Sequence, residues 1–377
     1  MKNWLRKIAV ALFGFGQMAN TSDIPNFAET EQEAKQGNAA SQFNLGLMYY
    51  LGKGATKDYK QAEHWFRRAA EQGDVEAQSN LGGLYYKGQG VAQDYEQAKY
   101  WFQKAAAQGF AKAQYDLGTI YFFGKGIEQD YDQAAQWYEK AAEQGYLDAQ
   151  YNLAIMYDNG LGVGKAPEKA FQWYRKAAEQ GDNQAQYTVA TRYMHGLGVQ
   201  KDFKQAVLWL HRAADQENIK AQSDLGVAYH NGFGVRQDDK QALYWYRKAA
   251  EQGNAKAQYN LGVMYANGQG VYKDDAQAVR WYHKAAEQDV AQAQFNLGIM
   301  YDQGKGVRQD DVQAVHWYRK AAEQGYAEAQ YNFGVMYANG EGVRQNYKIA
   351  KEWFGKACDN GLQQGCDTYR ELNQAGY

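Results

Sequence analysis

The chain has 377 residues, with 41 lysines and arginines against 43 aspartates and glutamates and a net charge of −2. This balance offers no basic excess for nucleic acid and no block of like charge typical of a disordered tail. Proline is nearly absent, with 2 residues, and the composition fits a soluble helical protein.

Residues 1–22 have the character of a secretory signal peptide. Lys2, Arg6 and Lys7 form a positive segment, the apolar core Ile8–Phe15 follows, and small residues come next. The core is too short to remain as a membrane-spanning anchor. We therefore expect a periplasmic or secreted bacterial protein with no stable membrane span after signal cleavage. The alternative is the apolar N-terminus of a cytoplasmic protein.

Residues 23–37 are polar and helix-prone. Within them, Asn26–Gly37 aligns loosely with the second helix of the repeat that follows, without its tryptophan. We expect an N-terminal capping helix with a solvated outer face, because an end unit of a stacked array has only one neighbour.

Residues 38–361 consist of near-copies of one unit. A tryptophan recurs every 36 residues, at Trp65, Trp101, Trp137, Trp173, Trp209, Trp245, Trp281, Trp317 and Trp353. A constant period in this range is the signature of a stacked repeat array, so we expect one continuous array in spite of the length. Residues that recur in every unit serve stacking, and these tryptophans are expected in the core.

Each unit predicts two helices joined by a short loop. In Ala77–Gly109, apolar residues follow helical spacing before and after a Gly-x-Gly sequence. Gly88 stands where the first helix (helix A) needs a left-handed end, and Asp94 stands where the second (helix B) needs an N-cap. Gly82 lies inside helix A and predicts a close approach between helices. A phosphate-binding loop is disfavoured, because a helix precedes the glycines and no P-loop spacing follows.

The pattern A-x(3)-L-G-x(2)-Y-x(2)-G-x-G-V-x(2)-D-x(3)-A-x(2)-W resembles the Sel-one-like repeat family, a relative of the tetratricopeptide repeat. The resemblance covers nearly all of 38–361. It implies an all-α fold, a right-handed α/α superhelical solenoid of nine 36-residue repeats with capping helices. We expect A helices to line its inner surface. The family's usual work implies a scaffold or adaptor that binds a protein or peptide partner.

Residues 362–377 predict a C-terminal capping helix. Cys358 falls in the last turn of a B helix and Cys366 in the first turn of this next helix. Neighbouring helices across so short a turn can bring the Cα atoms within bridging range, so we expect a disulfide. The alternative is two small buried thiols.

The stretch from Lys356 to Asp367 also resembles the cysteine-rich Helicobacter branch of the family, which pairs cysteines eight apart in nearly every repeat. Some members of that branch bind or hydrolyse β-lactams. Here only the last unit carries the pair. A β-lactam-binding or hydrolysing protein is therefore one alternative function, and a cytosolic adaptor is another.

No pattern predicts catalytic residues, a cofactor or a metal site. The 6 histidines are scattered, and neither a Cys/His cluster nor a catalytic serine motif occurs. We therefore expect a non-catalytic scaffold.

One position of helix A varies along the array and is our candidate for recognition. It follows a recurring tyrosine and is expected to point away from helix B. Its residues run from aromatic to small or acidic: Tyr50, Tyr86, Phe122, Asp158, Met194, His230, Ala266, Asp302 and Ala338. Because aromatic side chains dominate interface hot spots, we expect the first six to form a peptide-binding groove with anchor pockets toward the N-terminal half.

Overall fold

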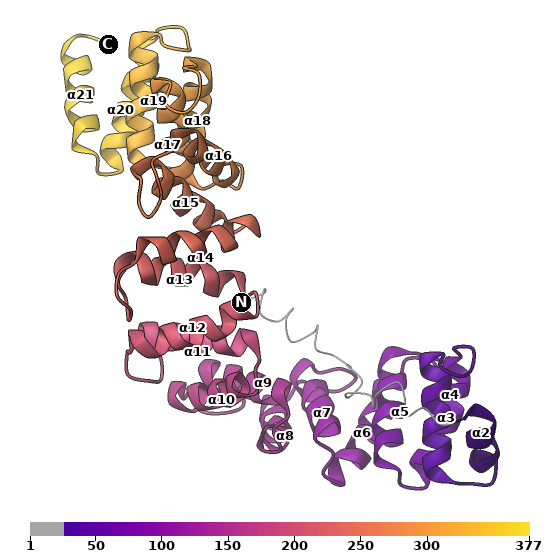
Figure 1. Cartoon of the computed structure of the whole chain (residues 1–377). Helices are drawn as coiled ribbons and strands as arrows, with labels where there is room; N and C mark the ends of the chain where they lie inside the picture. The colour runs from indigo at the N-terminus through magenta and orange to yellow at the C-terminus, as the bar shows by residue number, and fades with distance from the viewer. Residues whose placement is uncertain (1–25) are drawn as a thin grey trace. The chain divides into compact units, whose positions relative to one another are not determined.

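The structure, a computed structural model, describes residues 26–377, and the predicted signal peptide lies outside them. Regular structure in this range consists of twenty α-helices, with no strand among the described residues (Figure 1). The A helices are α3 (Ala39–Leu51), α5 (Val75–Lys87), α7 (Ala111–Phe123), α9 (Leu147–Asn159), α11 (Asn183–His195), α13 (Ile219–Asn231), α15 (Ala255–Asn267), α17 (Ala291–Gln303) and α19 (Ala327–Asn339). The B helices are α4 (Tyr59–Glu71), α6 (Tyr95–Ala107), α8 (Tyr131–Glu143), α10 (Pro167–Glu179), α12 (Phe203–Asp215), α14 (Asp239–Glu251), α16 (Asp275–Ala286), α18 (Asp311–Glu323) and α20 (Tyr347–Asp359). The predicted all-α fold of nine repeats is confirmed.

Helices occupy both segments predicted as caps. The first, α2 (Phe27–Lys35), buries Ala34 against a cluster that includes Leu45 and Trp65. The last, α21 (Gln363–Gln374), packs on α20 and is mostly exposed. Each end helix thus covers one neighbour and presents its polar side to solvent.

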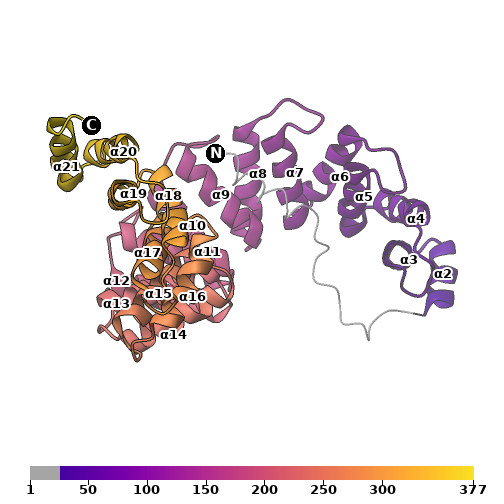
Figure 2. The same ribbon diagram turned by 90° about the horizontal axis from the view of Figure 1, so that it is seen from above.

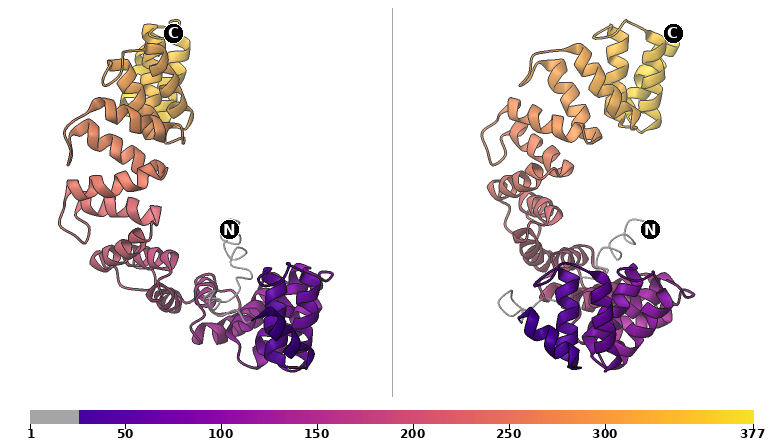
Figure 3. Two further views of the ribbon diagram at one scale, coloured as in Figure 1. Left: turned by 45° about the vertical axis from the view of Figure 1, so that its right-hand side comes forward. Right: turned by 90° about the vertical axis from the view of Figure 1, so that its right-hand side faces the viewer.

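The helices group into two compact units. The first unit ends at Lys201, and the second begins at Asp202. Within each unit a helix contacts chiefly the helices before and after it in the chain, and the hairpins follow one another in chain order (Figures 2 and 3). The buried residues accordingly form a series of local clusters. Such nearest-neighbour packing is the property that makes a repeat array extendable.

The Gly-x-Gly loop closes the hairpin as predicted. Gly88 ends α5 in the left-handed conformation, with φ +67°, and Asp94 caps α6 by accepting from the Gln97 N–H at 3.0 Å. The second glycine of the loop, Gly90, lies against the preceding hairpin, where a Cβ would stand 2.2 Å from the Tyr59 carbonyl oxygen. The loop therefore joins two helices and also packs on the previous repeat.

Gly82 confirms the predicted close approach of helices A and B. A Cβ on Gly82 would lie 2.8 Å from the ring of Phe102, nearer than real contacts allow. The same clash recurs in other hairpins, where the glycine faces the ring at the equivalent B-helix position: Gly46, Gly118, Gly226, Gly262, Gly298 and Gly334. A glycine inside a helix costs about 1 kcal/mol, and here the ring of helix B fills the space it leaves.

The tryptophans pack between hairpins and carry a cationic cover. Trp65, Trp101 and Trp209 are buried, and Trp101 packs with residues of the hairpin before it. A lysine or arginine one turn further along lies over every indole, 3.7–5.4 Å from the ring centroid. These cation–π contacts shield the solvent side of each indole. Their signal is visible in the sequence, where Lys or Arg stands three residues after each repeat tryptophan.

A ladder of buried glutamines joins successive hairpins. Gln258 donates to the Ala250 carbonyl of the preceding hairpin at 3.0 Å and accepts from Gln288 at 2.7 Å. Equivalent pairs of bonds recur at Gln42, Gln78, Gln114, Gln150, Gln222, Gln294 and Gln330. Because a buried amide is costly unless it is hydrogen-bonded, the ladder favours one register between neighbouring repeats.

Candidate functional site

The aromatic residues predicted to anchor a partner are not open to solvent. Tyr50, Tyr86 and Phe122 are 8%, 9% and 1% exposed. Each packs edge to face on the first residue of its own B helix, with ring centroids 5.2 Å apart in all three pairs. The prediction of open aromatic anchor pockets at these three positions is therefore corrected.

The loop explains this burial. A helical wheel places the position of Tyr50 away from helix B, but the loop turns the chain back so that Tyr59 covers it. The later members of the series also have local partners. His230 pairs with Asp239 of its own hairpin, with 2.9 Å between Nδ1 and Oδ1. At Tyr50, Tyr86, Phe122 and His230, the side chain at this position therefore packs inside its own hairpin.

The other two predicted groove residues lie near the end of the first unit. Asp158 forms an ion pair with Arg192 of the next A helix. Met194 is half-buried. The six predicted residues are therefore separate local contacts, and the structure does not bring them together as one exposed row.

In α5, Asn80, Gly83 and Lys87 are half-exposed. At the equivalent positions of α7, Asp116 and Thr119 are buried and only Phe123 is half-buried. The three α5 residues line a small cavity of about 10 Å³ shared by three A helices. Its lining consists of Tyr50 of α3; Ser79, Asn80, Gly83, Leu84 and Lys87 of α5; Gln89 of the loop; and Lys112 of α7. We call this cavity the α5 notch. Its volume holds one small polar group.

Two small residues open the α5 notch. The position of Ser79 carries an aromatic ring in every hairpin except those of α5 and α13. Such a ring packs on helix B; for example, the ring centroids of Tyr115 and Tyr138 are 5.5 Å apart. The position of Gly83 carries a larger side chain in every other hairpin. No atom lies within 4 Å of the place where a Gly83 Cβ would be. Unlike Gly82, Gly83 is not required by packing.

Two lysines and one aspartate set the charge of the α5 notch. Lys112 Nζ lies 2.9 Å from Oδ2 of Asp116, which is 1% exposed. Burial raises the pKa of Asp116, while Lys112 and Lys87 oppose that shift. Burial lowers the pKa of Lys87, and the charge of Lys112 lowers it further, against the effect of Asp116. Both lysines therefore act on the Asp116 carboxylate.

The polar groups of the α5 notch differ from those of other hairpins. Ser79 Oγ is buried and has no hydrogen-bond partner among the described residues. At the position of Asn80, other hairpins place an asparagine that hydrogen-bonds a tyrosine of the preceding B helix, namely Asn152, Asn260, Asn296 and Asn332. Phe66 replaces that tyrosine before Asn80 and has no hydroxyl. The sequence therefore contained the signal, as a departure from its own repeat.

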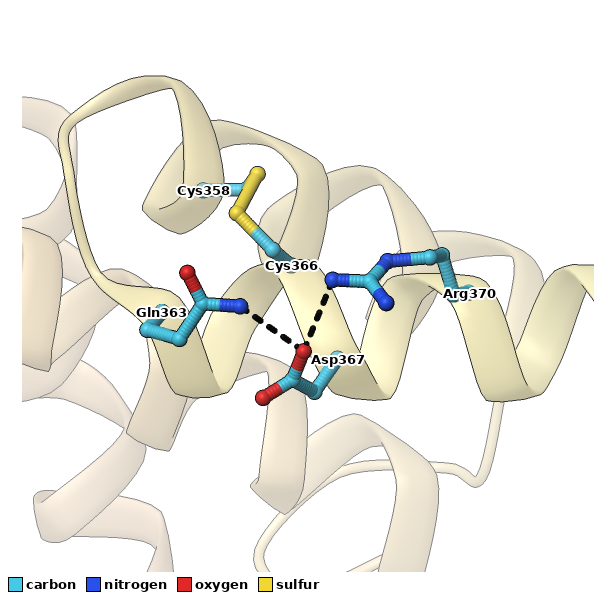
Figure 4. The surroundings of a disulfide bond; sticks show 5 residues. All are labelled: Cys358, Gln363, Cys366, Asp367 and Arg370. Carbon is cyan, nitrogen blue, oxygen red and sulfur yellow. Dashed lines mark hydrogen bonds and ion pairs between the residues drawn. A yellow bond between two sulfur atoms is a disulfide. The ribbon is translucent and has the colours of Figure 1, made fainter.

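The two cysteines meet at the C-terminal end of the second unit. Cys358 lies in the last turn of α20 and Cys366 in the first turn of α21, with Cα atoms 4.5 Å apart and their sulfurs bonded (Figure 4). Next to them, Asp367 accepts hydrogen bonds from Gln363 and Arg370, each at 2.8 Å. This geometry allows the predicted disulfide, which would hold α21 on the array.

Over residues 26–377, no group of three or more His, Cys, Asp and Glu side chains could hold a metal ion. Nor does any helix in that range have the length and apolar content needed to cross a membrane.

The similarity to known proteins has the same 36-residue period as the repeats. The Sel1 repeat family matches nine consecutive segments: 39–74, 75–110, 111–146, 147–182, 183–218, 219–254, 255–290, 291–326 and 327–362. The chain belongs to the Sel1 repeat family. Members of this family are generally protein-interaction scaffolds.

One solved Sel1 structure supports this assignment, and two further relatives are similar in sequence. A Sel1 repeat protein from Oxalobacter formigenes is 33% identical over 87% of this chain and 93% of its own, with a TM-score of 0.67. The structure of c5321, a protective antigen of uropathogenic Escherichia coli strains that displays an SLR fold, is 36% identical over 93% of this chain and 91% of its own, with a TM-score of 0.46. The secretory immunoglobulin A-binding protein EsiB of Escherichia coli O6:H1 is 38% identical over 68 residues, which are 18% of this chain and 14% of EsiB.

Proposed function

We propose that this Sel1 repeat protein is a non-catalytic scaffold that binds a segment of a partner protein on the A helices of its first unit, at α5. The observation that carries the proposal is the α5 notch, a cavity that α3, α5 and α7 line together. Residues that serve only stacking recur in every repeat, whereas Ser79, Gly83 and Lys87 occur together in one. Extended or helical segments bind solenoids along such continuous rows of helices.

We further propose that the protein works outside the bacterial cytoplasm. The signal-like residues 1–22 and the Cys358–Cys366 pair support this setting, because disulfides persist in oxidising compartments. The name of EsiB describes a relative that binds an immunoglobulin. The cytosolic adaptor remains the competing proposal, and fractionation of cells that express the full chain separates the two.

Site-specific photocrosslinking tests the binding face. A photoreactive amino acid replaces Phe123, which is half-buried at the end of α7, at the position equivalent to Lys87. In a control it replaces Tyr100, which is 45% exposed on α6. We expect one discrete crosslinked partner from position 123 and none from position 100. Equal crosslinking from both positions would contradict the assignment to the A helices. Turnover of nitrocefin by the purified protein would instead support the β-lactam alternative.

A further inference from the structure

We infer that a second binding surface runs along the loops of the second unit and takes an acidic segment of a partner protein. In each hairpin loop of that unit, one exposed residue directly follows a valine. We call these residues the arginine edge: Arg236, Tyr272, Arg308 and Arg344. The α5 notch lies in the other unit, so this inference goes beyond the proposed function and does not depend on it.

The packing of successive hairpins places the arginine edge in one row. A Cβ on Gly270 would lie 2.4 Å from the carbonyl oxygen of Asp239, the first residue of the preceding B helix. Gly306 and Gly342 stand in the same way against the starts of α16 and α18. Each loop therefore lies beside the end of the loop before it, and the exposed side chains follow one another at one repeat per step.

The three guanidinium groups of the arginine edge have no partner within the part of the chain that the structure describes. None of them forms an ion pair, a side-chain hydrogen bond or a ring contact there. By contrast, Arg67 pairs with Glu63 and Arg319 with Glu323 on the B helices. A guanidinium group presents its N–H donors in a planar fork that matches a carboxylate. The edge thus offers three positions at which a carboxylate can bind.

The carboxylates of the same loops and of the B-helix starts already have partners. Some of them cap the B helices by accepting from backbone N–H groups, namely Asp238, Asp274 and Asp310. The others each have a side-chain partner: Asp239 with His230, Asp275 with Lys273, Asp311 with Gln309, and Glu341 with Asn339. The arginines are therefore left for a carboxylate that a partner supplies.

The arginine edge is confined to the second unit. In the first unit the same position holds neither a cation nor an aromatic residue, but Thr56, Ala92, Glu128, Gly164 and Gln200. A position that varies in this way is not needed for stacking, and Tyr272 is 96% exposed. Tyrosine and arginine are, with tryptophan, the residues enriched in interface hot spots. The composition of the edge is therefore that of a protein-binding surface.

A protein segment fits the arginine edge better than a nucleic acid does. A phosphate backbone carries a charge on every nucleotide and would meet the carboxylates between the arginines as well. A peptide can place acidic residues opposite the arginines and neutral residues between them. Successive hairpins lie about 10 Å apart, from the usual distance between packed helices, and an extended chain rises about 3.3 Å per residue. Acidic residues about three or six positions apart would therefore face neighbouring arginines.

Peptide selection with a depletion step tests the inference on the purified full chain. A phage library of random twelve-residue peptides is first depleted on the double variant Arg236→Gln and Arg308→Gln, and then selected on the unaltered protein. The peptides that remain are those that need the arginines. One enriched peptide is then titrated by fluorescence anisotropy. Glutamine suits the double variant because Gln200 occupies this position in the first unit.

Two further variants complete the titration. Tyr272→Ala removes the exposed ring, and Ala92 shows that alanine is accepted at this position. The charge-matched control is Lys220→Gln together with Lys256→Gln. These two lysines are exposed in the first turns of α13 and α15, at the opposite ends of those helices from the loops.

We expect the enriched peptides to carry more than one Asp or Glu. Affinity should fall by about tenfold or more in the double variant and by about threefold or more in Tyr272→Ala, and the control should bind as the unaltered protein does. Enriched peptides without acidic residues, no enrichment above background, or an equal loss in the control would overturn the inference. Arginine-dependent binding of a thymidine oligonucleotide in place of acidic peptides would overturn it too. The crosslinking at position 123 tests the α5 notch separately, so either proposal can fail while the other stands.

Discussion

Replacing Gln258 by leucine should weaken the second unit by removing one rung of the glutamine ladder. Gln258 is 4% exposed, and its side chain makes a 3.0 Å bond to the Ala250 carbonyl and a 2.7 Å bond from Gln288. Leucine has a similar volume, so the change removes hydrogen bonds without opening a large cavity. Each bond contributes about 1 kcal/mol net. The Ala250 carbonyl still accepts from the Gly253 N–H at 3.0 Å, so the change leaves it with a partner. We therefore expect the free energy of unfolding to fall by about 2 kcal/mol, the sum of the two lost bonds.

Urea unfolding followed by far-ultraviolet circular dichroism measures this change, with the slope m checked for constancy. The matched control is Gln292→Leu on the exposed face of α17, which should change stability by less than about 0.5 kcal/mol. A double-mutant cycle with Gln288→Ala should give a coupling of about 0.5 kcal/mol or more. The reasoning fails if Gln258→Leu costs no more than the control, because the ladder would then be a consequence of stacking and not a cause.

Three further outcomes are expected from the described packing. Trp209→Ala should cost about 3–5 kcal/mol, since the indole is 6% exposed, and a loss below about 1 kcal/mol would contradict its core role. Gly82→Ala should destabilise the protein, because the new Cβ would stand 2.8 Å from the ring of Phe102. Gly83→Ala should stabilise it by about 1 kcal/mol, because no atom lies near the new Cβ and alanine favours the helix. Equal effects of the two changes in urea unfolding would refute this contrast. Reduction of Cys358–Cys366 should cost roughly 2–3 kcal/mol, and two free thiols detected by mass spectrometry in protein isolated from the envelope would refute the bridge.

The period and the turn chemistry predict most of the fold. A tryptophan every 36 residues, a glycine at the end of helix A and an aspartate before helix B are local signals, and nearest-neighbour packing turns them into an array. Gly82 is a further local signal. A glycine inside a helix lowers helix stability, so its presence predicts a compensating contact, and the ring of Phe102 makes that contact.

The error in the predicted groove has an equally physical cause. A helical wheel describes one helix, and it cannot show that a loop returns the chain onto the position of Tyr50. In several hairpins, the first residue of helix B supplies the partner that the wheel omits. Tyr50 faces Tyr59 and Tyr86 faces Tyr95, whereas His230 faces Asp239, an acidic residue at the same place in its own hairpin. Variation that is matched by a packing partner reports on packing.

Variation without a matching partner is therefore the better guide to binding in a repeat protein. Ser79 lacks the ring that most hairpins carry at its position. On the facing helix B, Phe102 is an aromatic residue of the usual size and not a larger one that would replace the missing ring. Gly83 lacks a side chain and nothing approaches it. Both changes cost stability, through lost contacts and through helix propensity. Positions of this kind are where a bound partner segment is best sought, and the crosslinking experiment at the neighbouring position 123 tests this one.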